Sequence, residues 1–158
     1  MPIIYLRAFN GLFVHAYNGG GGSLQALVDP ALEWESFTVP GNLASGAVVT
    51  LKTYTGHYWC AENGGGGILV ANRTQALGWE QFKIIGLGMA DGTPLSSGAQ
   101  VAIVTPDNQW FVCAENGGQS TLNVTRRAIG GWETFRLEIG GNEPRPAYDT
   151  WRTFPTNA

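Results

Sequence analysis

The chain has 158 residues, a formal net charge of −3 and a pI near 5.3. At this length and 44% hydrophobic content it can form one domain with a core, but it is too short for two ordinary domains. Only nine Lys and Arg residues are present, and they are scattered, which argues against a nucleic acid as partner because its backbone requires a clustered basic surface. The 23 glycines break up any helical periodicity, so we expect an all-β fold.

One motif occurs three times along the chain: Asn-Gly-Gly, an apolar stretch, and then Trp-Glu-any-Phe. The Asn precedes the Trp by 16 residues in every copy. Successive copies are displaced by 45 and then 53 residues, so they differ in length by one insertion. A single unit of this size cannot bury its apolar face alone, whereas neighbouring units can do so together.

The repeats are expected at about residues 3–41, 48–86 and 101–139. The second copy predicts four strands, at 48–54, 58–62, 68–71 and 80–84, separated by glycine-containing turns. Asn followed by Gly favours a hairpin turn over a ligand-binding loop. Three copies suffice for a closed pseudo-threefold barrel, whereas solenoids and propellers usually need more. The sequence therefore predicts a β-trefoil over residues 1–140, with a proline-containing tail or linker at 141–158.

Aligned columns of the repeat alternate with a period of two, which identifies the buried face of each strand. The phenylalanines of the motif are expected to join this core. The predicted core columns are Ile4/Val49/Ala102, Leu6/Leu51/Val104, Val14/Trp59/Val112, Ala16/Ala61/Ala114, Leu24/Leu69/Leu122, Ala26/Ala71/Val124 and Phe37/Phe82/Phe135.

The Trp-Glu-any-Phe motif supplies the first candidate binding residues. If it is a strand with Phe facing inward, Trp faces outward and Glu lies on the Phe side. An exposed indole beside a carboxylate makes a good sugar platform, because pyranose C–H groups stack on the ring while the carboxylate accepts hydroxyl hydrogen bonds. The alternative is a core Trp with a Glu that binds loop N–H groups, and the residue types leave both readings open. The candidates are Trp34, Glu35, Trp79, Glu80, Trp132 and Glu133.

Two further columns differ between copies. Glu62 and Glu115 correspond to Tyr17 in the first copy, and Arg73 and Arg126 correspond to Val28. An Arg-Glu pair between these columns could be a surface salt bridge or could hold sugar hydroxyls. We therefore expect the first site to be weaker or altered in preference.

Cys60 and Cys113 occupy one column, with His15 in the first copy. Equivalent positions around a threefold axis are usually well separated, so we expect two free, buried thiols rather than a disulfide. The three residues lack the spacing of a zinc site, and we expect no metal and no cofactor.

Catalysis is not expected either. Glycoside hydrolysis requires two carboxylates on either side of one bond, whereas the repeat distributes identical carboxylates to three distant places. The exception would be convergence of Glu62 with Glu80, or of Glu115 with Glu133, within one copy.

The combined motif resembles the fascin-like β-trefoils of bacteria, and in particular the family-92 carbohydrate-binding modules. The resemblance covers roughly residues 3–140 and is carried by three stretches of the second copy: Tyr58-Trp59-Cys60-Ala61-Glu62-Asn63-Gly64-Gly65, Leu69-Val70-Ala71-Asn72-Arg73 and Gly78-Trp79-Glu80-Gln81-Phe82.

This resemblance implies a non-catalytic binder of β-glucan, β-1,3 or β-1,6 linked, with up to three sites. It implies Trp platforms with Glu partners, and the first copy departs from the family pattern at His15, Tyr17 and Val28. A lectin for galactose-type or host glycans and an actin-binding or structural protein remain alternatives. Such modules are often attached to polysaccharide-degrading enzymes.

Location and assembly follow less directly. The sequence shows no signal peptide and no membrane span, so we expect no membrane partner. An extracellular location is expected if this is a module of a larger secreted protein, and a cytoplasmic one otherwise. We expect a monomer.

Overall fold

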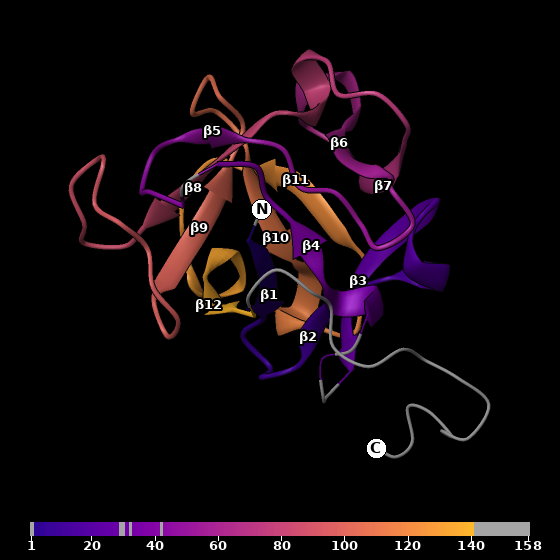
Figure 1. The fold of residues 1–158 in the computed structure, drawn as a ribbon, viewed down its shortest axis with the longest axis horizontal. Coiled ribbons are helices and arrows are strands. Elements are labelled where there is room, and N and C mark those ends of the chain that lie inside the picture. The colour runs from indigo at the N-terminus through magenta and orange to yellow at the C-terminus, as the bar shows by residue number, and fades with distance from the viewer. Residues whose placement is uncertain (1, 29–30, 32, 42, 141–158) are drawn as a thin grey trace.

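Twelve β-strands linked by turns form one continuous sheet in the computed structural model, which describes residues 2–28, 31, 33–41 and 43–140 (Figure 1). Within these residues the helical elements are six short 3-10 turns. The strands are β1 (Ile3–Arg7), β2 (Phe13–Ala16), β3 (Gly22–Val28), β4 (Phe37–Thr38), β5 (Val48–Val49), β6 (Tyr58–Ala61), β7 (Leu69–Arg73), β8 (Phe82–Gly86), β9 (Gln100–Val104), β10 (Phe111–Ala114), β11 (Leu122–Arg126) and β12 (Phe135–Ile139). The 3-10 turns are η1 (Tyr17–Gly19), η2 (Glu33–Glu35), η3 (Glu62–Gly64), η4 (Gly78–Glu80), η5 (Glu115–Gly117) and η6 (Gly131–Glu133). The tail predicted at 141–158 lies outside the described residues.

Six strands close into a barrel. β1 pairs with β4 and β12, β8 pairs with β5 and β9, and β9 pairs with β12. A bridge between Thr38 of β4 and Lys52, which follows β5, joins the two ends. The ring β1-β4-β5-β8-β9-β12 is therefore closed and leaves no open sheet edge.

The other six strands form three hairpins that cap this barrel. β2 pairs with β3, β6 with β7 and β10 with β11. The hairpins also contact one another: β3 pairs with β7, Gln25 bridges Thr121, and Ile68 bridges Asn123. Two barrel strands and one hairpin from each repeat give the predicted all-β fold, a β-trefoil with three pseudo-symmetric repeats of four strands.

The predicted core columns are buried, with one correction of register. The motif phenylalanines pair with Ile4, Val49 and Val101 in the three repeats, so the third member of that column is Val101 and not Ala102. By the same shift Ile103, not Val104, belongs with Leu6 and Leu51 in the central core. The error arose because the insertion between the second and third motifs places the first strand of the third repeat one residue earlier than the displacement of the motif.

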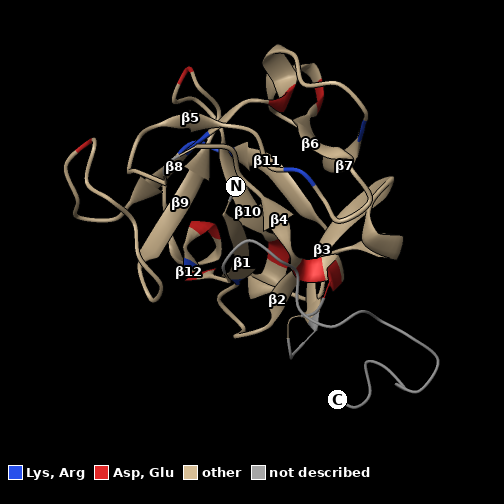
Figure 2. Cartoon of the chain, viewed as in Figure 1, with Lys and Arg blue, Asp and Glu red and all other residues tan. Residues whose placement is uncertain are grey.

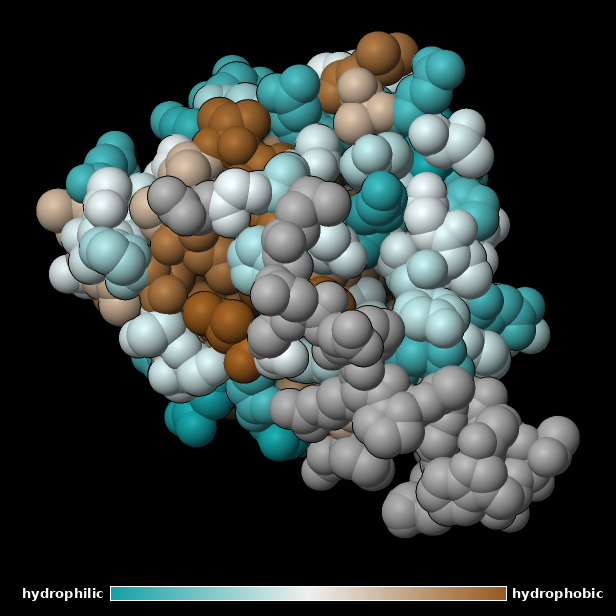
Figure 3. Space-filling model, in the orientation of Figure 1, coloured by the Kyte–Doolittle hydropathy of each residue, from teal (hydrophilic) through white to brown (hydrophobic). Residues whose placement is uncertain are grey.

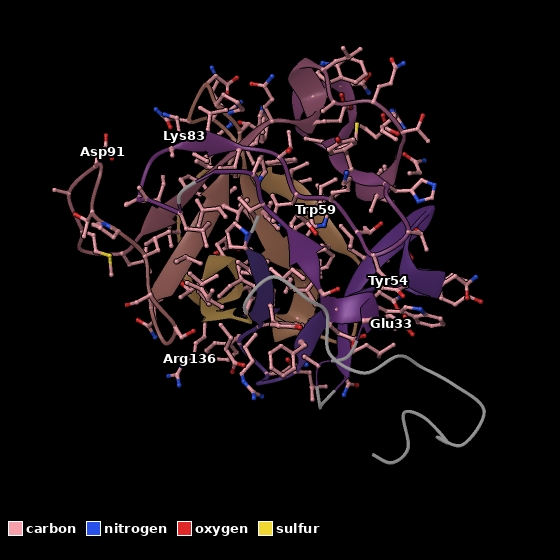
Figure 4. The ribbon with its side chains drawn as sticks, viewed as in Figure 1. Glu33, Tyr54, Trp59, Lys83, Asp91 and Arg136 are labelled. Atoms are coloured by element: carbon pink, nitrogen blue, oxygen red, sulfur yellow. The ribbon has the colours of Figure 1, made fainter. Side chains whose placement is uncertain are left out.

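Trp59 fills the central core, where it is fully buried (Figure 4). Its ring packs edge-on against Phe37, with centroids 5.0 Å apart, and against Phe82, with centroids 6.2 Å apart. The equivalent positions of the other two repeats hold the smaller Val14 and Val112. The single indole of Trp59 therefore fills the central space that these three positions surround.

Charges are sparse and spread over many elements in the view of Figure 2. On the same face, hydrophobic residues stand in groups between polar ones (Figure 3). No helix in the described part of the chain is long and apolar enough to cross a membrane.

Candidate functional site

The Trp-Glu pair of each repeat lies in a 3-10 turn and not in a strand. The turns η2, η4 and η6 contain it, and the barrel strand begins only at the Phe of the motif. The strand predicted at 80–84 therefore began two residues too early, and the alternation argument for the exposed Trp does not apply. The turn forms because the N–H of Gln81 donates to the carbonyl of Gly78, at 3.3 Å.

The three motif glutamates are buried, and two of them bind the first backbone N–H of their own turn. Glu35, Glu80 and Glu133 are 0%, 3% and 6% exposed. Oε1 of Glu80 accepts the N–H of Leu77 at 2.7 Å, and Oε1 of Glu133 accepts that of Gly130 at 2.7 Å. The expectation of an open carboxylate beside the indole is therefore not met, because the carboxylate folds back to hold the start of its own turn.

Cys60 and Cys113 lie beside the buried glutamates of their own repeats. Both cysteines are free and buried, as predicted. Burial, and next the hydrogen bond from each thiol to Glu80 or Glu133 of its own repeat, raises the pKa of each thiol to about 12. Each thiol thus stays protonated. Sγ of Cys60 also lies 3.9 Å from Oε1 of the outer Glu62, to which it donates.

In the first repeat a histidine contacts the buried motif glutamate. His15 replaces the cysteine, and its Nδ1 hydrogen-bonds the carboxylate of Glu35. The imidazole also lies against Trp34, with ring centroids 5.4 Å apart. His15 therefore contacts both the buried carboxylate of Glu35 and the indole of Trp34.

In the second and third repeats an arginine joins the buried motif glutamate to an outer glutamate. Nη2 of Arg73 lies 2.6 Å from Oε1 of Glu62, and its Nε lies 3.9 Å from Oε2 of Glu80. Nη2 of Arg126 lies 2.8 Å from Oε1 of Glu115, and its Nε lies 3.7 Å from Oε2 of Glu133. The predicted Arg-Glu pairs are confirmed, and the two carboxylates of each repeat converge on the arginine.

This convergence does not create a hydrolytic pair. The arginine occupies the space between the two carboxylates, and the inner one is buried and already accepts a backbone N–H. A general acid and its partner must instead face a common bond of the substrate.

The Asn-Gly dipeptides form the predicted hairpin turns. Asn63 and Gly64 have φ of 59° and 82°, and the N–H of Gly65 donates to the carbonyl of Glu62 at 3.1 Å. Two positive φ values define a type I′ turn, which Asn-Gly adopts readily. Asn18-Gly19 and Asn116-Gly117 repeat the geometry, with φ of 56° and 80°, and of 59° and 79°.

Each motif indole rests its N–H edge on this turn, and in the second and third repeats much of the remaining ring surface faces solvent. A Cβ on Gly64 would lie 3.5 Å from Nε1 of Trp79, and a Cβ on Gly117 would lie 3.4 Å from Nε1 of Trp132. Trp79 is 46% exposed and Trp132 is 37% exposed, while Trp34 is partly buried. The reading of the motif Trp as a core residue is therefore wrong for Trp79 and Trp132.

The indole of Trp79 stands between two surface hollows. One, of about 500 Å³, is lined by Arg73, Thr74, Gln75 and Leu77. The other, of about 290 Å³, is lined by Gly64, Gln81 and the segment 105–107 of the next repeat. The polar side of the site is thus Arg73 with its neighbours.

Sequence reasoning missed the contribution of the next repeat to each site. Phe9 and Tyr54, both exposed, lie beside the Trp132 and Trp34 turns, and Pro106 lies beside Trp79. The only available signal was that Phe9 and Tyr54 occupy one column of the repeat. Among the described residues, no three His, Cys, Asp or Glu side chains gather so as to hold a metal ion.

These features define a β-trefoil whose three repeats each carry a Trp-Glu turn. Solved structures with this architecture include a designed threefold-symmetric protein, ThreeFoil, with a TM-score of 0.67 and 13% identity over 86% of this chain and 97% of that one. The SDF2-like protein from Arabidopsis thaliana has a TM-score of 0.67 and 14% identity over 86% of this chain and 91% of that one. A Caenorhabditis elegans protein of unknown function has a TM-score of 0.66 and 12% identity over 85% and 92%. These likenesses establish the fold alone.

By sequence, no family model and no curated protein matches the chain.

Proposed function

We propose that the protein is a non-catalytic, multivalent carbohydrate-binding module that uses Trp34, Trp79 and Trp132 as stacking platforms. The observation that carries this proposal is the motif indole set beside a buried carboxylate and a positive-φ turn in each repeat, with Trp79 and Trp132 exposed and Trp34 partly buried. An indole that only filled space would be buried, as Trp59 is. An outer aromatic face fixed in place suits the apolar face of a pyranose.

Polar contacts would come from the outer charged residues. In the second and third repeats the side chains of Glu62, Arg73, Glu115 and Arg126 are 30–36% exposed, so they can still reach sugar hydroxyls. In this proposal Glu35, Glu80 and Glu133 position the platform and do not touch the sugar. The first site, which has Tyr17 and Val28 in place of the Glu-Arg pair, has the weaker polar side.

The ligand class we propose is β-glucan, β-1,3 or β-1,6 linked. A neutral polymer suits sites whose charges are paired within the protein. The β-linked glucose chain is the ligand that the resemblance to the family-92 carbohydrate-binding modules implies. Shallow sites of this kind bind weakly, with a Kd near ~1 mM or about −4 kcal/mol. Three sites facing different directions would raise the avidity for a polymer.

By the same resemblance, we propose that the module acts outside the cell as part of a polysaccharide-degrading protein and that it is monomeric. No observation favours the galactose-type lectin or the actin-binding alternative. The first alternative would bind galactose-type or host glycans, and the second would bind actin filaments and no sugar.

Affinity electrophoresis tests the proposal. A native gel containing β-1,3- or β-1,6-glucan should retard the protein, and a gel containing an α-glucan should not. Trp79→Ala and Trp132→Ala should each reduce the retardation, and the variant lacking all three platform indoles should migrate as in a gel without glucan. The matched control is Val48→Ala, which shortens an exposed apolar side chain on β5, outside the three turns. Retardation of the triple variant equal to that of the wild type would contradict the proposal.

A further inference from the structure

Phe9 lies at the edge of the Trp132 site although it belongs to the first repeat. It is 67% exposed. A Cβ on Gly117 would lie 3.0 Å from Cδ2 of Phe9 and 3.4 Å from Nε1 of Trp132, so the two rings meet at one turn glycine. The N–H of Asn10 donates to the carbonyl of Gly117 at 2.8 Å, which fixes the loop of Phe9 to that turn.

Tyr54 has the equivalent position one repeat later, at the Trp34 site. It is 50% exposed, and its hydroxyl donates to Glu33, the residue before Trp34 (Figure 4). This hydrogen bond raises the pKa of Tyr54. The N–H of Thr55 donates to the carbonyl of Gly19 at 3.0 Å, which matches the bond from Asn10 to Gly117.

The Trp79 site has no ring in this column of the repeat. The Trp110 indole packs against Gly65 and Gly66 of the same turn, but it does not line either of the two hollows beside Trp79. Thr53 and Thr105 begin equivalent loops. The N–H of Thr53 donates to the carbonyl of His57 at 2.7 Å, and the N–H of Thr105 donates to the carbonyl of Trp110 at 3.0 Å. The residue after Thr53 is Tyr54, and the residue after Thr105 is Pro106.

The surface around Trp79 is open as a result. A Cβ on Gly78 would have no atom within 4 Å, whereas one on the equivalent Gly131 would lie 3.1 Å from Phe9. Asp107 lines this hollow, and the hydrogen bond from Thr105 lowers the pKa of its carboxyl, which keeps it an acceptor near neutral pH.

We propose that the sites are completed across repeat boundaries and that they differ for this reason. The Trp132 and Trp34 sites present two aromatic surfaces, from Phe9 and Tyr54, and so contact two sugar units of a β-linked oligosaccharide. The Trp79 site presents one aromatic surface beside Asp107 and contacts one unit. This inference rests on the proposed function, because it assigns residues that set ligand length at the same sites.

Titration of the indole N–H resonances with a β-1,3-linked glucose disaccharide gives a Kd for each site separately, once the resonances are assigned with single Trp variants. Phe9→Ala should raise the Kd at Trp132 about fivefold, the loss expected for one aromatic contact, and leave the Kd at Trp79 unchanged. Tyr54→Ala should do the same at Trp34, while Tyr54→Phe, which keeps the ring, should have a smaller effect. Pro106→Tyr should lower the Kd at Trp79.

Unchanged affinity at Trp132 in a folded Phe9→Ala protein, with binding at the platform indoles intact, would overturn this inference and leave the proposed function standing. If Phe9→Ala does not fold, Phe9→Leu replaces it, because it keeps apolar bulk without a ring and should still weaken the Trp132 site. No shift of any platform indole in the wild-type protein, with this disaccharide or with its β-1,6-linked isomer, would overturn the proposed function itself.

Discussion

Alanine substitution of Trp79 and of Glu80 should lower the free energy of unfolding by different amounts, because the indole is partly exposed and the carboxylate is buried. Glu80→Ala removes a buried carboxylate that accepts the N–H of Leu77 at 2.7 Å and lies 3.9 Å from Nε of Arg73. A hydrogen bond to a charged group contributes about 1.5–3 kcal/mol, and the orphaned N–H adds to the loss, so we expect a cost of about 3 kcal/mol. In a domain of this size that lowers Tm by about 10 °C.

Trp79→Ala should cost less, although it removes a larger side chain. A fully buried Trp contributes 150–250 Å², and Trp79 is 46% exposed, so about 100 Å² of buried surface is lost. At about 25 cal/mol per Å², corrected for a compact denatured state, the cost is about 2 kcal/mol.

Urea and thermal unfolding of both variants measure this difference, with Asp91→Ala as the control that removes one exposed acidic side chain. The control should change stability by less than about 0.5 kcal/mol. A Glu80→Ala protein as stable as the control would refute this role of the buried carboxylate. A Trp79→Ala cost of about 4 kcal/mol, the value for core Trp, would refute the surface platform.

Two further predictions concern the glycine loop and the thiols. Gly65→Ala should destabilise by more than about 2 kcal/mol in urea unfolding, because φ is 127° and a Cβ there would overlap the Trp110 indole, whereas Gly67→Ala, with nothing within 4 Å, should be nearly neutral. Cys60 and Cys113 should react with a thiol reagent at pH 8 to 9 only after unfolding, and fast reaction of the folded protein would contradict their burial. Because the folded pKa of about 12 lies above the ordinary value of 9, the stability that these thiols contribute is fully present below pH 9 and is lost as the pH rises toward 12, which a pH series of urea unfolding checks.

The fold could be predicted because the repeat records it directly. Three copies of one motif, with period-2 apolar columns, leave few closed architectures, and the buried columns followed from alternation. The register of the first strand in the third repeat could not be predicted, because the insertion lies between that strand and the preceding motif, and only the pairing of Phe135 with Val101 shows where the strand starts.

The site was predictable in its residues but not in its geometry. The spacing identified Trp79 and Arg73, yet the role of Glu80 depends on a 3-10 turn, which period-2 reasoning does not consider. Phe9 and Tyr54 were missed because they reach a motif of the previous repeat around the barrel, and such a contact depends on how the repeats close.

The most direct test of the central claim is the number of binding sites that calorimetry measures with short β-1,3- and β-1,6-gluco-oligosaccharides. If three surface indoles bind β-glucan, the wild-type protein should give two or three sites, and Trp132→Ala should give one fewer. No heat with either ligand, from a folded protein at millimolar ligand, would contradict the account.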